Sequence, residues 1–189
     1  MRILSLNEIL VTNLKDQITL RIIKVNNFIQ ALEVSIKTQN WYSVLFISLT
    51  LPDIFGKIDE PNKGSQARTV NWYNKYMKNM YTHHIGPDRL EHTFLSGNDF
   101  YALRCAYLHE GSDDIRNQRA QDVLEKFEFV QPTSHRSLHC NQFDQMLLLQ
   151  VDRFGKDVMS AVGSWLKDIE GDVEKTNKLN ELLKIKIMP

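Results

Sequence analysis

The stretch "NWYSVLFISLTLPDIFGK" (residues 40–57) is apolar on almost every side of the helix that it predicts. A helix without a polar face is typical of a buried element, so we expect this one to be buried in the core. It should begin at or just after Asn40. Pro52 has no backbone N–H and is therefore expected to end or kink the helix. The next segment, "DEPNKGS" (59–65), has the composition of a loop.

Three further segments have helical periodicity. Over residues 14–36 the apolar side chains recur in steps of four and three, which predicts one long helix. Residues 66–81 carry large apolar side chains at four-residue spacing and predict a third helix. A fourth runs through "DFYALRCAYLHEG" (99–111), with Ser96 or Asn98 as its N-cap and the final glycine as its end.

The pattern changes after the fourth helix. "KFEFVQ" (126–131) alternates apolar and polar residues, and "SLHCNQF" (137–143) and "QMLLLQ" (145–150) are further extended segments, so two or three short strands are expected. A last long helix follows, with Asp152 as its N-cap. The predicted fold class is therefore mainly α, a helical bundle with a small antiparallel β element before the last long helix.

The length of 189 residues fits one domain, which we assign to residues 1–170. Residues 171–189 form a polar, weakly amphipathic C-terminal tail that is expected either to fray or to dock on a partner. Basic and acidic residues number 23 each, so no overall charge draws the protein to nucleic acid or anionic lipid. Any RNA contact must therefore be local.

Several features favour a cytoplasmic protein without membrane association. The N-terminal segment lacks the uninterrupted apolar region of a secretory signal, and the longest apolar run, "VLFISL" (44–49), is too short to cross a bilayer. The two cysteines form no CxxC pair. His83 and His84 would point about 100° apart on a helix, and the other histidines show no ligand spacing. We therefore expect neither a metal site nor a cofactor.

Arg104 and His109, near the end of the fourth predicted helix, are two side chains suited to phosphate chemistry. Arginine offers a permanently charged fork of donors to phosphate oxygens, and histidine is the usual general acid or base near neutral pH. Together they suffice for metal-free RNA cleavage, in which the ribose 2′-hydroxyl attacks the adjacent phosphorus. Five positions on an α-helix separate the two side chains by about 140°. They converge only if the last turn unwinds or a second subunit supplies a matching pair.

The motif formed by Arg104, four residues "CAYL" and His109, in a helical chain of this size, resembles the HEPN superfamily. The wider string "YALRCAYLHEGS" (101–112) is also similar to uncharacterised bacterial proteins of this type. The resemblance implies a metal-independent endoribonuclease of the toxin or antiphage-defence kind, with Arg104 and His109 as catalytic residues. It further implies a homodimer, RNA as the substrate, a 2′,3′-cyclic phosphate product and, for toxins, an antitoxin or another partner protein.

The residue after the arginine departs from this pattern. Catalytic HEPN members often carry a polar residue there, whereas this chain has Cys105, whose thiol is only a weak hydrogen-bond donor. A second interpretation therefore stays open. The chain could be a non-catalytic HEPN-like module that binds a nucleotide, RNA or a partner protein.

Further residues are predicted to support the motif: Asp53, Arg68, Cys105, Tyr107 and Glu110. Asp53 lies in an apolar stretch and needs a partner if it is buried, which Arg68 or Arg104 can supply. Alternatively, Asp53 caps a short turn. Tyr107 belongs to the motif helix, and Glu110 with the glycine after it would permit the last turn to unwind.

Overall fold

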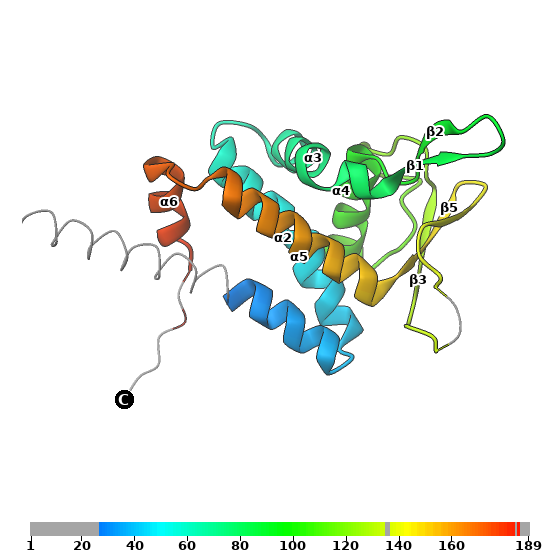
Figure 1. The fold of residues 1–189 in the computed structure, drawn as a ribbon, viewed down its shortest axis with the longest axis horizontal. Helices are drawn as coiled ribbons and strands as arrows, with labels where there is room; N and C mark the ends of the chain where they lie inside the picture. The colour runs from blue at the N-terminus through cyan, green and yellow to red at the C-terminus, as the bar shows by residue number, and fades with distance from the viewer. Residues whose placement is uncertain (1–26, 135–136, 184, 186–189) are drawn as a thin grey trace, which may run out of the picture.

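The computed structural model describes residues 27–134, 137–183 and 185 of the chain (Figure 1). Residues 27–37 are helical, and the predicted beginning of this helix, residues 14–26, lies outside the described residues. The helical elements that follow are α2 (Trp41–Asp59), α3 (Ser65–Tyr76), the 3-10 turn η1 (Lys78–Tyr81), α4 (Gly97–Cys105), the π turn η2 (Ala106–Glu110), α5 (Val151–Asp168) and α6 (Val173–Asn180). The strands are β1 (Thr82–Ile85), β2 (Leu90–Thr93), β3 (Lys126–Val130), β4 (Asn141–Phe143) and β5 (Met146–Gln150). The described chain is mainly helical, as the sequence predicts.

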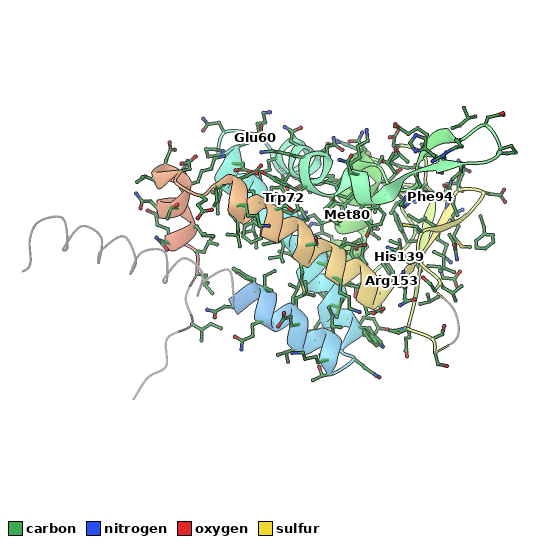
Figure 2. All side chains as sticks on the ribbon, viewed as in Figure 1. Glu60, Trp72, Met80, Phe94, His139 and Arg153 are labelled. Carbon is green, nitrogen blue, oxygen red and sulfur yellow. The ribbon has the colours of Figure 1, made fainter. Side chains whose placement is uncertain are left out.

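Helix α2 is buried in the core, as its composition predicts. It begins after Asn40, whose side chain accepts a hydrogen bond from the backbone N–H of Ser43. It packs against α3, α4, α5 and α6, and α5 crosses over it in Figure 1. Phe55 of α2 stacks on Trp165 with 4.4 Å between ring centroids, and its centroid lies 6.2 Å from that of Trp72, which is labelled in Figure 2. This aromatic group joins α2, α3 and α5.

Of the two outcomes predicted for Pro52, the end of the helix is wrong, because α2 continues to Asp59 with Pro52 inside it. Proline removes one backbone hydrogen bond from a helix interior, which destabilises the helix locally. Here Leu51 and Pro52 are buried, and so are Phe55 and Ile58 in the following turns. Tertiary packing on both sides of the proline holds the helix together.

The third predicted helix, residues 66–81, is shorter in the structure, and the two adjacent histidines that follow it lie on a strand. Helix α3 ends at Tyr76, and after η1 the chain forms an antiparallel hairpin of β1 and β2 in which His83 pairs with His92 and His84 with Glu91. The turn between the strands contains Gly86 in the left-handed region, with φ of 72°. The hairpin projects from the helical part of the molecule (Figure 1).

The three strands before α5 form a mixed sheet and not the purely antiparallel element predicted. Strand β5 lies in the middle, antiparallel to β4 and parallel to β3. A parallel pair needs a long crossover connection. The segment between β3 and β5, which includes β4, provides it here. Short-range alternation identifies such strands but carries no signal for their relative direction.

The start of α5 also differs from the prediction. The N-cap is Gln150, which has no side-chain capping bond, and Asp152 lies in the first turn. Strand β5 continues directly into the helix, so no loop separates the two elements and the helix begins earlier than expected. Asp152 instead accepts hydrogen bonds from the side chains of Gln150 (2.7 Å) and Lys156 (2.7 Å).

Part of the predicted C-terminal tail is ordered as α6, which packs on α2 of its own chain. Lys175 forms an ion pair with Asp59 (2.7 Å), and Leu179 is completely buried. Residues 184 and 186–189 lie outside the described residues.

The close approach of α3 to α2 should depend on Gly56. A Cβ atom at this position would lie 2.6 Å from the backbone carbonyl oxygen of Arg68. Gly56→Ala is therefore expected to lower the free energy of unfolding by about 1–3 kcal/mol, as overpacking against a rigid backbone does. Chemical denaturation measures this change.

Gly163→Ala in α5 is the matched control, because a Cβ atom there meets nothing within 4 Å. This substitution should stabilise the protein by roughly 0.5–1 kcal/mol through helix propensity alone. Equal effects of the two substitutions would contradict the steric explanation.

Candidate functional site

Asp53 lies at the centre of a polar cluster that joins three helices. Its Oδ1 accepts hydrogen bonds from Arg68 Nε (2.7 Å), Ser65 Oγ (3.0 Å) and Thr69 Oγ1 (3.2 Å). Its Oδ2 accepts a hydrogen bond from Arg104 Nη2 (2.8 Å). The sequence left the partner of Asp53 open between two arginines, and in the structure both arginines bind it. We call these five residues the Asp53 cluster.

Helical spacing explains why α3 supplies three members of the cluster. Ser65, Arg68 and Thr69 are separated by three and four positions, so they share one face of the first turns of α3. Residues 60–64 turn the chain back so that this face packs on α2. Arg104 arrives from the last turn of α4 and completes the cluster from a third direction.

The Asp53 cluster carries a surplus of positive charge, because two guanidinium groups share one carboxylate. The side chains of Asp53, Arg68 and Arg104 are 12%, 19% and 14% exposed, so the three charges are largely withdrawn from water. Arg104 Nε is buried and has no hydrogen-bond partner among the described residues. Two cations that share one carboxylate leave one positive charge uncompensated, and such a charge attracts an anion.

Tyr101 lies beside Arg104 of the Asp53 cluster, and it was not predicted from the sequence. The guanidinium carbon of Arg104 lies 5.8 Å from the centre of the Tyr101 ring, which is three positions earlier on α4. Burial raises the pKa of the Tyr101 hydroxyl, and the neighbouring Cys105 thiol raises it further. Cys105 itself is a half-buried free thiol. The three-residue spacing between Tyr101 and Arg104 on one helix could have predicted that their side chains lie close together. No such spacing in the sequence relates Ser65 or Thr69 to Asp53.

The motif helix ends in the π turn η2, which contains His109. Gly111, with φ of 66°, closes the turn by donating its N–H to the carbonyl oxygens of Ala106 and Tyr107. A π turn holds more residues than an α turn, so each residue advances by a smaller angle and His109 rotates back toward the face of Arg104. The last turn therefore widens instead of unwinding. His109 is exposed at this end of the helix.

Three of the predicted supporting residues, Cys105, Tyr107 and Glu110, lie outside the Asp53 cluster. Tyr107 is buried and packs edge-on against Phe46 of α2, with 5.1 Å between ring centroids. Burial raises the pKa of its hydroxyl, which has no hydrogen-bond partner among the described residues. Glu110 is exposed and accepts a hydrogen bond from Gln118 Nε2 (2.8 Å). Tyr107 therefore positions the motif helix on α2, and Glu110 faces solvent.

Asp53→Asn should destabilise the protein strongly, because it leaves two largely buried guanidinium groups without an anion. Removing one partner of a buried ion pair typically costs about 3–5 kcal/mol of unfolding free energy. The matched control is Asp113→Asn, since Asp113 is exposed and belongs to no ion pair among the described residues. Urea denaturation of both variants checks this prediction. A loss no larger than that of the control would show that the cluster does not hold α2, α3 and α4 together.

Comparisons of the chain with protein-family models, with curated proteins and with solved structures found no match. Within residues 27–134, 137–183 and 185, none of the helices has both the length and the apolar character needed to cross a membrane. The same residues contain no group of three or more histidine, cysteine or carboxylate side chains arranged to hold a metal ion. A function for this protein therefore has to be inferred from the geometry of the Asp53 cluster and of the π turn.

Proposed function

We propose that this protein is a metal-independent endoribonuclease of the HEPN type that acts as a homodimer. Arg104 binds the scissile phosphate and His109 transfers a proton. Such an enzyme would belong to the toxin or antiphage-defence class, and in the toxin class an antitoxin or other partner protein would restrain it.

The observation that carries this proposal is the state of Arg104. The Asp53 carboxylate fixes one end of its guanidinium group through Nη2 (2.8 Å), while the side chain stays 14% exposed and is therefore partly open to solvent. A guanidinium group held in this way is oriented before a phosphate arrives, so little side-chain entropy is lost on binding. Preorganised donors of this kind stabilise the charge that develops on phosphate oxygens in the transition state.

The π turn supports the role of His109. It brings an exposed imidazole back toward the face of the helix from which Arg104 projects. In the proposed reaction a histidine removes the proton of the ribose 2′-hydroxyl, and the oxygen attacks the adjacent phosphorus. The P–O bond to the 5′-oxygen breaks, and this oxygen takes a proton from a second histidine. A homodimer supplies the two histidines from two copies of His109.

An apolar surface beside the motif supports the proposed homodimer. Tyr42 and Phe46 project from the first turns of α2 and are 76% and 49% exposed. Phe46 packs on Tyr107, which lies in the same turn as His109. Burying these aromatic side chains against a second copy would place two motif helices close together, because a two-fold interface uses the same surface twice.

Two observations favour the alternative, a non-catalytic module that binds a nucleotide, RNA or a protein. Arg104 is already ion-paired with Asp53, and Cys105 stands where a polar residue would assist catalysis. In this case the surplus charge of the Asp53 cluster would hold a phosphate without cleaving the chain. RNA binding without cleavage would favour this second function.

The reaction itself is the first test. Purified protein is expected to cleave single-stranded RNA in the presence of EDTA, because arginine and histidine carry out the whole transfer. The products should carry 2′,3′-cyclic phosphate and 5′-hydroxyl ends, which mass spectrometry distinguishes from other termini. Cleavage that requires added Mg²⁺ and leaves 5′-phosphate ends would rule out the proposed mechanism.

His109→Ala tests the motif. It should lower the cleavage rate by about 10² to 10⁴, the usual contribution of a positioned general acid or base. The exposed position of His109 predicts an unchanged melting temperature and an unchanged dimer by light scattering. His84→Ala, an exposed histidine on β1, is the matched control and should cleave like the parent. Full activity of His109→Ala on every RNA that the parent cleaves would remove His109 from the mechanism.

A further inference from the structure

A cavity of about 480 Å³ lies next to the Asp53 cluster, on the side of Arg68. Residues of α2 and α3 form one part of its lining, and α6 with the residues after it forms another. Its volume falls within the range of small-molecule sites in proteins, roughly 300–1,000 Å³. The packing of α6 on α2 therefore creates a pocket with a wall from the predicted C-terminal tail.

Three kinds of side chain line this cavity. Ile54, Ile58 and Leu182 supply apolar contact area. Lys57, Arg68 and Lys178 supply positive charge, and Glu181 supplies a carboxylate in addition to Asp53. Apolar walls with a few placed charges are the usual composition of a ligand site.

The positive charges are only partly neutralised. Arg68 shares the carboxylate of Asp53 with Arg104. Lys57 donates to the backbone carbonyl of Pro61 and forms no ion pair among the described residues. Lys178 is paired with Glu174, whose side chain is 78% exposed, and ion pairs at the surface are weak. The cavity therefore favours an anionic group on its ligand.

We propose that this cavity binds one nucleotide. Its phosphate would contact Lys57, Arg68 and Lys178, and its base would lie against the apolar wall. Glu181 would accept hydrogen bonds from ribose hydroxyl groups, which a carboxylate does readily. A nucleotide combines the anionic, hydroxyl-rich and flat apolar parts that these three groups of residues match.

The nucleotide can come from two sources that share this chemistry. It is either one unit of the RNA that Arg104 contacts or a free nucleotide. Arg68 and Arg104 bind the two oxygens of the same carboxylate, so a phosphate on Arg68 lies close to the proposed catalytic arginine. Binding of a nucleotide does not depend on RNA cleavage, and only the first source rests on the proposed ribonuclease function.

Isothermal titration calorimetry on the full chain tests the proposal, with AMP and UMP as probes and with adenosine and inorganic phosphate as their fragments. AMP and UMP should bind, and each fragment should bind more weakly. Lys57→Met and Lys178→Met should each weaken AMP binding about tenfold, because each removes a charged donor. Lys167→Met, an exposed lysine at the end of α5, is the matched control and should leave the affinity unchanged.

Three results would overturn the proposal: no binding of AMP or UMP at about 1 mM, adenosine binding as tightly as AMP, or unchanged affinity in both lysine variants.

Cleavage assays then distinguish the two sources of the nucleotide. If the cavity binds one unit of the RNA substrate, Lys57→Met should raise KM for oligonucleotides but not for a dinucleotide, and AMP should inhibit cleavage competitively. If the cavity binds a free nucleotide, AMP should change kcat for RNA cleavage instead. If the parent cleaves no RNA, the ribonuclease proposal fails while calorimetry still decides whether the cavity binds a nucleotide.

Discussion

The carboxylate of Asp53 is the interaction on which the rest of the site depends. It binds Arg68 of α3 at 2.7 Å and Arg104 of α4 at 2.8 Å, and it lies on α2, against which the other helices pack. Removing three charged groups from water is costly, and the cluster persists because every oxygen of the carboxylate has a charged donor. Its net charge is nevertheless positive. The same contact that fixes the helices therefore leaves one positive charge of the Asp53 cluster uncompensated.

Features that depend on neighbours in the chain could be predicted from the sequence, and features that depend on distant residues could not. The burial of α2 and the glycine that closes η2 follow from local pattern, and so does the N-cap of α4 at Ser96, one of the two residues predicted for it. The parallel pairing of β3 with β5 has no local signature. The same limit holds in the site, because Arg104 meets Asp53 across 51 positions. The sequence predicted Arg68 or Arg104 as the partner of Asp53, but not that both bind it.

The π turn shows how backbone geometry alters what a motif can do. On a regular α-helix, Arg104 and His109 would point in divergent directions, which argues against cooperation within one chain. The wider turn closed by Gly111 reduces this divergence, and π turns inside α-helices frequently occur at functional sites. The motif helix remains anchored by Tyr107 against Phe46, while His109 itself stays exposed.

The shared carboxylate also links the cavity beside Arg68 to the motif beside Arg104. An anion that draws Arg68 away from Asp53 leaves the carboxylate to Arg104 alone and strengthens that ion pair. In the same way, an anion that draws Arg104 away from Asp53 strengthens the ion pair between Asp53 and Arg68. Linkage requires that each site change the affinity of the other by the same factor. If both arginines keep their contacts with Asp53, two phosphates bound at once would share the surplus charge of the Asp53 cluster, and each would weaken the binding of the other. The sign of the coupling therefore depends on whether the arginines keep these contacts.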